Sequence, residues 1–140
     1  LDGIELFGDI NLGQGLTLRS NYTFLETDTS SGRLTRRPRH RGNILLNFRQ
    51  EKFHINLNAN IVGKRDDIGV VSSADVKEAG HVKLDLASSY NLPWRLPGVK
   101  GLSLYGKIEN LLNKKYEEAD GFLARPVNFL IGVRGVFGKD

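Results

Sequence analysis

Apolar and polar residues alternate along most of this chain, and the alternation is cleanest between Phe53 and Ile61. In that stretch every second residue is apolar, and the residues between them are His54, Asn56, Asn58 and Asn60. Successive side chains of a β-strand point to opposite faces, so a period of two predicts a strand with one apolar and one polar face. The segments with this pattern are Gly3–Leu12, Leu16–Glu26, Asn43–Gln50, Phe53–Ile61, His81–Asn91, Leu102–Glu109 and Val127–Phe137.

The connections between these predicted strands alternate in length. In chain order they are Gly13–Gly15, Thr27–His40, Glu51–Lys52, Gly63–Gly80, Leu92–Lys100 and Leu112–Pro126. Short or compact turns therefore alternate with long polar loops, which places all the long loops at one rim of a sheet. The predicted fold class is all-β, an antiparallel meander of about seven strands.

Composition excludes several classes of protein. The chain has no cysteine, which excludes a disulfide framework and a cysteine-based nucleophile or metal site. No apolar run approaches the roughly 20 residues of a transmembrane helix, whereas a transmembrane strand needs only about 9–11 alternating residues. The net charge of +4 is concentrated in one arginine cluster, so no basic face for nucleic acid is predicted.

The alternation fits two kinds of β protein. In a soluble sandwich the apolar face packs inward, and in a membrane barrel it contacts lipid while the polar face lines the lumen. The asparagine-rich polar face and the length of the predicted strands favour the barrel. Aromatic residues near the predicted strand ends, where an aromatic belt would lie, also favour it: Tyr22, Phe24, Phe48, Phe53, Tyr90 and Phe137.

A motif near the end of the chain adds a family resemblance. Lys107–Tyr116, KIENLLNKKY, resembles the penultimate-strand motif of the TonB-dependent outer-membrane receptors. The strand that follows Gly121–Pro126 and ends at Phe137 looks like the last strand of that family. Two departures are Leu112, where the family often has Phe, and the tail Gly138–Asp140 after the aromatic residue.

The resemblance implies that residues 1–140 are a partial receptor barrel, formed by the C-terminal strands of a larger one. Seven strands at about 4.8 Å spacing cover an arc of roughly 34 Å, which is part of a barrel of about 22 strands. The plug domain and the segment that engages TonB are expected to be absent from these residues.

The resemblance also implies a function. The expected activity is energy-coupled uptake of a scarce nutrient across the outer membrane of a Gram-negative bacterium, without covalent chemistry and without a cofactor. The implied partners are outer-membrane lipid, TonB and the barrel-assembly machinery, which reads the final strand and its aromatic residue, Phe137. The segment Gly32–Arg37 and the motif Gly106–Leu111 look somewhat like the cobalamin receptors. Ferric siderophores, the commoner cargo of the family, are the other expected ligand.

Few residues suggest chemistry of their own. The basic cluster Arg36, Arg37, Arg39 and Arg41 is predicted to lie in one external loop, where it would contact an anionic ligand or lipopolysaccharide phosphates, or only solvent. His81 and Asp85 are four residues apart on one strand, about 13 Å, so they are not a catalytic pair.

Metal sites are also weakly indicated. His40 and His54 have no visible ligand partners, and no metal site is predicted at either. The pair Asp66–Asp67 fits a solvated loop turn better than a calcium site.

Two alternatives of other classes remain at this point. One is a soluble β-sandwich or lipocalin-like small-molecule binding module. The variant Leu57→Asp would distinguish the two folds, because it would harm membrane insertion of a barrel but disrupt the soluble core of a sandwich. The other is a barrel enzyme of the outer membrane. It would need acid and base residues at the outer rim, and the candidates are Asp66, Asp67, Glu117, Glu118 and Asp120.

Overall fold

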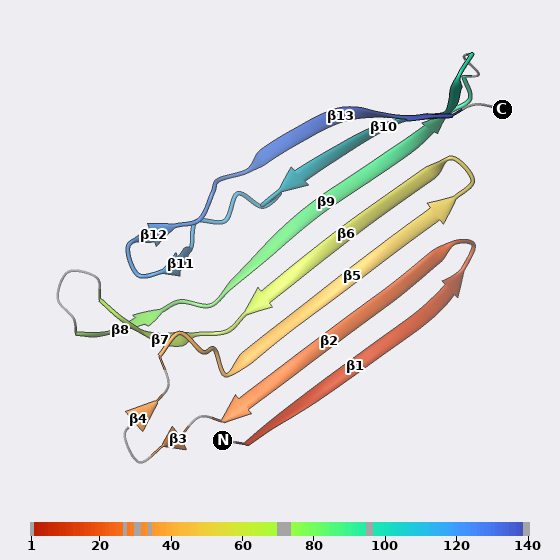
Figure 1. The fold of residues 1–140 in the computed structure, drawn as a ribbon. Coiled ribbons are helices and arrows are strands. Elements are labelled where there is room, and N and C mark those ends of the chain that lie inside the picture. Colours follow the sequence, from red (N-terminus) through yellow and green to blue (C-terminus); the bar gives the residue numbers. More distant parts are fainter. Residues whose placement is uncertain are drawn as a thin grey trace.

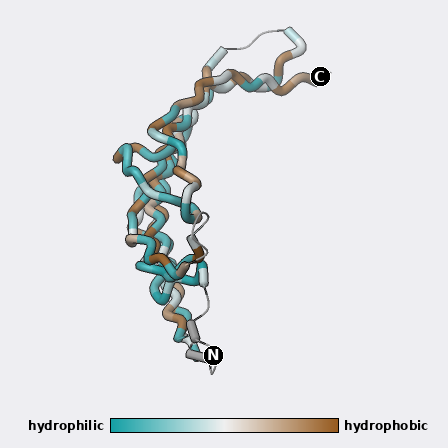
Figure 2. Tube along the Cα trace, turned by 90° about the vertical axis from the view of Figure 1, so that its left-hand side faces the viewer, coloured by the Kyte–Doolittle hydropathy of each residue, from teal (hydrophilic) through white to brown (hydrophobic). Residues whose placement is uncertain are grey.

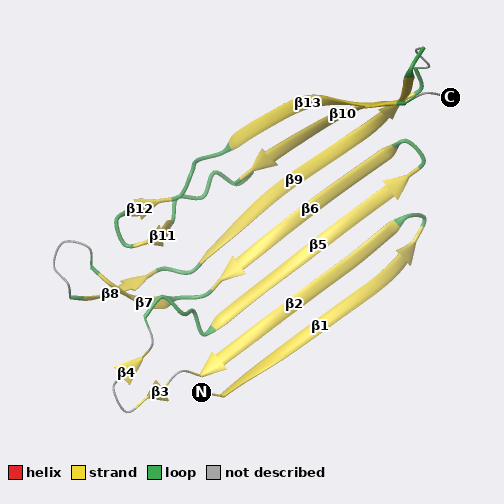
Figure 3. Ribbon diagram, viewed as in Figure 1, coloured by secondary structure: helices red, strands yellow, loops and turns green. Residues whose placement is uncertain are grey.

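The computed structural model describes residues 2–26, 28–29, 32–33, 35–69, 74–94 and 97–138, and its main body is one antiparallel sheet of seven strands (Figure 1, Figure 3). In spatial order the strands are β1 (Asp2–Gly13), β2 (Leu16–Glu26), β5 (His40–Gln50), β6 (Phe53–Val62), β9 (His81–Leu92), β10 (Val99–Glu109) and β13 (Asn128–Phe137). The spatial order follows the chain order, which confirms the predicted meander.

Each predicted long loop contains a short hairpin, and all three hairpins lie at the end of the sheet where the N-terminus lies (Figure 1). They are β3–β4 (Asp28–Thr29, Gly32–Arg33), β7–β8 (Arg65–Ile68, Asp75–Glu78) and β11–β12 (Glu117–Ala119, Phe122–Leu123). Strands of two to four residues are too short for alternation to reveal them. Thr27, Ser30, Ser31, Leu34 and residues 70–73 of these loops lie outside the described residues.

The turn between β1 and β2 shows why the short connections are tight. Gln14 and Gly15 both have positive φ angles, 51° and 79°, which is the signature of a two-residue type I′ hairpin. A Cβ atom on Gly15 would lie 1.8 Å from the carbonyl oxygen of Arg49 on the neighbouring hairpin. Only glycine fits this position, because both the backbone angle and the space exclude a side chain.

The apolar face of the sheet is continuous across all seven strands. One row of directly paired residues takes one apolar side chain from each strand: Ile10, Leu18, Leu46, Leu57, Leu86, Ile108 and Phe129. A shift of one residue in any strand would break this row, because it would move that strand's apolar set to the other face. The register therefore follows from the alternation seen in the sequence.

No apolar side chain is buried anywhere in the described part of the chain. Figure 2 shows the reason: the sheet is a single curved layer, and no second layer covers its apolar face. Phe129, Ile131 and Val133 on that face are 79%, 72% and 63% exposed. A soluble sandwich would bury such residues between two sheets, so the sandwich alternative is wrong for this fold.

The apolar face has the height of a bilayer core. From His40 to Gln50 strand β5 rises ten residues, roughly 33 Å at about 3.3 Å per residue, and a tilt of about 40° reduces this to about 25 Å. Tyr22 lies near one end of the face, and Phe53 and Tyr90, paired and with ring centroids 4.9 Å apart, lie near the other. The predicted aromatic residues thus occupy both rims. None of the described residues forms a helix with the length and apolarity needed to cross a bilayer.

Candidate functional site

The polar face carries a hydrogen-bonded network that links neighbouring strands. Asn43 donates to the side-chain oxygen of Asn58 at 2.7 Å. The oxygen of Asn47 lies 2.6 Å from the Nε2 atom of His54 and accepts a hydrogen bond of 2.9 Å from Asn56. His54 is therefore held by the side-chain amide groups of Asn47 and Asn56.

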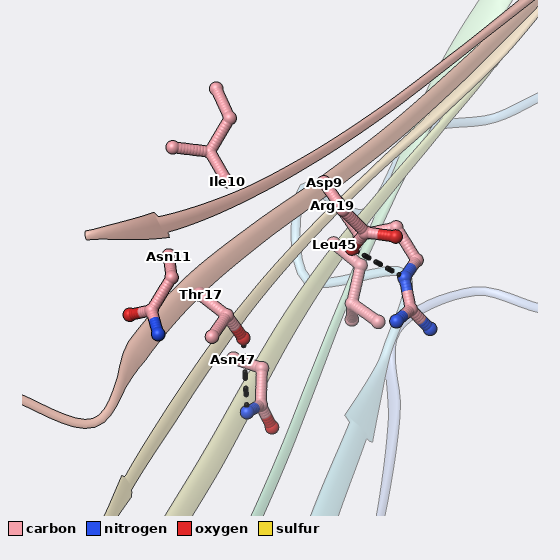
Figure 4. Close-up of a pocket in the computed structure, with 7 residues that line it drawn as sticks. All are labelled: Asp9, Ile10, Asn11, Thr17, Arg19, Leu45 and Asn47. Carbon is pink, nitrogen blue, oxygen red and sulfur yellow. Dashed lines mark hydrogen bonds and ion pairs between the residues drawn. The ribbon is translucent and has the colours of Figure 1, made fainter. Parts of the chain in front are cut away.

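This network continues to the β1 edge as an open groove of about 390 Å³ (Figure 4). Arg19 and Asp9 form an ion pair of 2.8 Å, and Asn47 donates to the hydroxyl group of Thr17 at 3.4 Å. Figure 4 shows these side chains on one side of the sheet and the side chain of Ile10 on the other. The groove therefore belongs to the polar face, which presents amides and charges of both signs to whatever passes along it.

The polar residues at the start of β9 are structural. Asp85 pairs with Lys83 at 3.1 Å and accepts a hydrogen bond of 2.8 Å from the backbone amide of Asn110. His81 instead stacks on Tyr116, with ring centroids 3.8 Å apart. The structure therefore places His81 and Asp85 against different partners, in agreement with the strand spacing.

The C-terminal motif has a clear structural role, which centres on Asn110. Its side chain is only 1% exposed and donates two hydrogen bonds of 3.0 Å, to the carbonyl oxygens of Lys114 and Arg125. Its side-chain oxygen accepts a third from the amide of Lys114, at 2.9 Å. Asn110 has a φ angle of 54°, which asparagine tolerates better than most residues. The motif therefore joins both ends of the third external connection.

Two arginines of the basic cluster are already paired. The Nε atom of Arg36 donates to Asp67 at 2.8 Å, and Arg39 donates to Glu26 at 2.7 Å. These contacts neutralise half of the predicted basic cluster within the protein. The guanidinium group of Arg36 keeps much of its surface in solvent, because its side chain is 58% exposed.

Arg41 lies in a strand, so the prediction that all four arginines share one loop is wrong. Strand β5 begins at His40, three residues before the predicted start, because its pairing with β2 continues beyond the alternating segment as far as Phe24 and His40. Alternation places Arg41 on the same face as Asn43, the polar one. The side chains of Arg41 and of the exposed Arg37 make no hydrogen bond or ion pair with another described residue.

Asp67 is not a solvated loop residue, which corrects the interpretation of the Asp66–Asp67 pair. It is 0% exposed, and its Oδ1 atom accepts hydrogen bonds of 2.8 Å from Arg36 and from the amide of Ile68. Its Oδ2 atom accepts one of 3.2 Å from the amide of Asp120. The bond from Arg36, opposed by burial and assisted by the two amides, lowers the pKa of Asp67, so the carboxylate stays charged in mild acid.

Arg65 makes a second link between the second and third external hairpins. It is 8% exposed and donates hydrogen bonds of 2.8 Å and 2.7 Å to the carbonyl oxygens of Glu117 and Glu118. Arg65 and Asp67 share a face of β7 because they are two residues apart on a strand. This two-residue spacing is a sequence signal for the two buried charges, but it is too short to distinguish a strand from a loop.

Three carboxylates beside Arg65 are the grouping within the described residues that could hold a cation. Glu78, Glu117 and Asp120 bring one oxygen atom each within 4.8 Å of one another. Burial, and then the charge of Glu117, raises the pKa of Glu78, while the nearby Arg65 opposes this shift. The guanidinium group of Arg65 therefore already supplies part of the positive charge that a bound cation would bring to these three carboxylates.

Comparison with known proteins agrees with this geometry. The chain resembles the ferripyoverdine receptor of the outer membrane of Pseudomonas aeruginosa, with a TM-score of 0.72 and 18% identity over 94% of this chain and 19% of that one. It also resembles a mutant ferric enterobactin receptor from Pseudomonas aeruginosa, with a TM-score of 0.73 and 19% identity over 94% of this chain and 21% of that one. The chain thus spans about one fifth of the length of these receptors.

A comparison with curated proteins gave no match. The family model described as "TonB dependent receptor-like, beta-barrel" matches residues 1–111. This family consists of transport receptors, which removes the barrel-enzyme alternative. With its single-layer meander, apolar outer face and polar inner face, the chain belongs to the β-barrel family of the TonB-dependent receptors.

Proposed function

We propose that the protein containing this chain is an outer-membrane receptor that takes up a ferric siderophore with energy supplied through TonB. Residues 1–140 would form part of the barrel wall and three of its external hairpins, with the plug and the TonB-engaging segment elsewhere in the full-length protein. The observation that carries the proposal is the seven-residue apolar row on a sheet without a core, which requires lipid on one face.

The ligand class is supported by the structural relatives. The two receptors described above are named for ferripyoverdine and ferric enterobactin, both of them iron complexes. Cobalamin, which the segment Gly32–Arg37 suggested, stays a prediction, and Leu34 of that segment lies outside the described residues.

Uptake by the source cells tests the function. Deleting the gene of the full-length protein should abolish uptake of radiolabelled iron from one ferric siderophore in a panel, and deleting TonB should do the same. Loss of labelled cobalamin uptake instead would contradict the siderophore assignment. Unchanged uptake of every compound in the panel would contradict the receptor function itself.

Of the two arginines of the basic cluster whose side chains have no partner among the described residues, Arg41 is the one that we propose contacts the ligand, because it lies on the polar face at the outer rim. A charge-assisted hydrogen bond is worth about 1.5–3 kcal/mol, so Arg41→Gln should weaken ligand binding by about 10- to 100-fold. Arg49 lies on the same strand and face at the opposite rim. Arg49→Gln is therefore the matched control, and its affinity should not change.

Titration of the purified full-length receptor with the ferric siderophore measures this difference. Equal affinities of the Arg41→Gln and Arg49→Gln variants would contradict a ligand contact. Binding of purified lipopolysaccharide would then show whether the basic cluster, including the exposed Arg37, serves that anionic lipid instead.

Phe137 is proposed as the aromatic residue that the barrel-assembly machinery reads. It is the last residue of β13, pairs with Val99 and is 75% exposed on the apolar face. Phe137→Ala should lower the amount of receptor assembled in the outer membrane severalfold, measured by blotting of membrane fractions. Phe122→Ala removes a similarly exposed ring from an external hairpin and should leave assembly unchanged. Equal amounts of the two variants would contradict this role.

A further inference from the structure

Asp67 joins three segments that lie far apart in the sequence. It belongs to the second external hairpin, Arg36 follows the first, and Asp120 lies in the third, 31 and 53 residues away in the chain. A second contact between the first two segments is the backbone hydrogen bond of 2.6 Å from Arg36 to Asp66. A single carboxylate thus contacts all three external hairpin segments of this part of the barrel.

Burial makes these contacts depend on one another. A charged carboxylate without access to water is tolerated only when its oxygen atoms are hydrogen-bonded and its charge is compensated. Asp67 is 0% exposed, and among the described residues only Arg36 supplies a full positive charge directly to its carboxylate. If Arg36 left, Asp67 would turn toward water, and its bond to the amide of Asp120 would be lost as well.

We propose that Asp67 is a positioning residue that couples the three external hairpins. Its carboxylate holds Arg36 and the third hairpin in one fixed arrangement. Its role for the ligand rests on the proposed function: Arg36 uses its Nε atom for Asp67, and its terminal nitrogen atoms remain available to an anionic group. A ligand that draws Arg36 toward it would then also shift the third hairpin. This reciprocity follows because both contacts share one buried charge.

Distances between spin labels on the full-length protein without ligand test the coupling. One pair, at Arg37 and Lys77, would report on the first and second hairpin segments, and the other, at Lys77 and Leu123, on the second and third. All three positions are exposed, and residues 1–140 contain no cysteine. Any cysteine elsewhere in the full-length protein is replaced before labelling. The distance distributions should be narrow for both pairs in the unchanged protein.

The informative variant is Arg36→Gln. Arg36 belongs to neither of the hairpins that carry the labels at Lys77 and Leu123, so a change in the distance between those labels must be transmitted through Asp67. The variant should widen the distribution between Arg37 and Lys77 and increase the population of the released first segment by about 10- to 100-fold. It should also widen the distribution between Lys77 and Leu123, though less, because Arg65 still donates to the carbonyl oxygens of Glu117 and Glu118. Asp67→Asn should also widen both. Asp75→Asn removes an exposed charge from the opposite strand of the same hairpin and should widen neither.

The proposal is overturned if Arg36→Gln widens only the first pair, since the contacts would then be independent. It is also overturned if Asp67→Asn changes neither distribution. Because no ligand is present in these measurements, they do not depend on the siderophore assignment, and a failed uptake assay would leave their outcome unaffected.

Discussion

Replacing Leu57 with arginine is expected to lower strongly the fraction of the protein that inserts as a stable barrel. Leu57 lies near the middle of β6, in the apolar row between Leu46 and Leu86. A lysine or arginine on the lipid face at the bilayer midplane costs about 2–4 kcal/mol, because the charge must be desolvated or drawn to the interface. That cost is a large fraction of the stability of a typical protein domain, about 5–15 kcal/mol.

The matched control is Asn58→Arg, one residue further along the same strand and on the polar face. This arginine would lie in the lumen, so the variant should assemble nearly as well as the unchanged protein. The measurement is the fraction of full-length protein that migrates as a folded barrel, together with its unfolding free energy in lipid vesicles. Equal losses in the two variants would contradict the assignment of the faces.

Replacing Asn110 with alanine should destabilise the third external hairpin by about 3 kcal/mol or more. The change leaves the amide and carbonyl groups of Lys114 and the carbonyl group of Arg125 without their partner. These three hydrogen bonds are partly buried and are worth about 1 kcal/mol each. Alanine is also less tolerant than asparagine of the positive φ angle at this position.

Asn113→Ala is the control for this change, since Asn113 also has a positive φ angle, 47°, but is exposed, and its side chain accepts a single hydrogen bond, from the backbone amide of Val127. Hydrogen exchange of the amides in β11 and β12 should accelerate strongly in the Asn110→Ala variant and little in Asn113→Ala. Equal acceleration would show that backbone strain, and not the buried network, determines the stability of this segment.

The sequence alone determined the seven long strands, their order and their two faces. A strand of about ten residues with strict alternation has only one arrangement that keeps its apolar side chains together, and Phe53–Ile61 shows this most clearly. The short turns then made neighbouring strands antiparallel, and the register followed because a one-residue shift would exchange the faces. The motif around Asn110 could also be recognised in the sequence, because it is a contiguous run of residues.

The tertiary structure decided what surrounds each charge at the outer rim. Asp67 looked like a solvated loop residue and Arg36 like a member of a loop cluster facing ligand or solvent, and nothing in the sequence singled out Arg65. Their partners are 31 to 53 residues away, and no local pattern connects them. Arg41 was misplaced because strand pairing, and not side-chain alternation, extends β5 to His40. The alternation of apolar and polar residues indicates how a strand pairs with the neighbouring strands of the sheet. Hydrogen bonds between distant loops depend on how the strands bring those loops together, so they appear only once the sheet has formed.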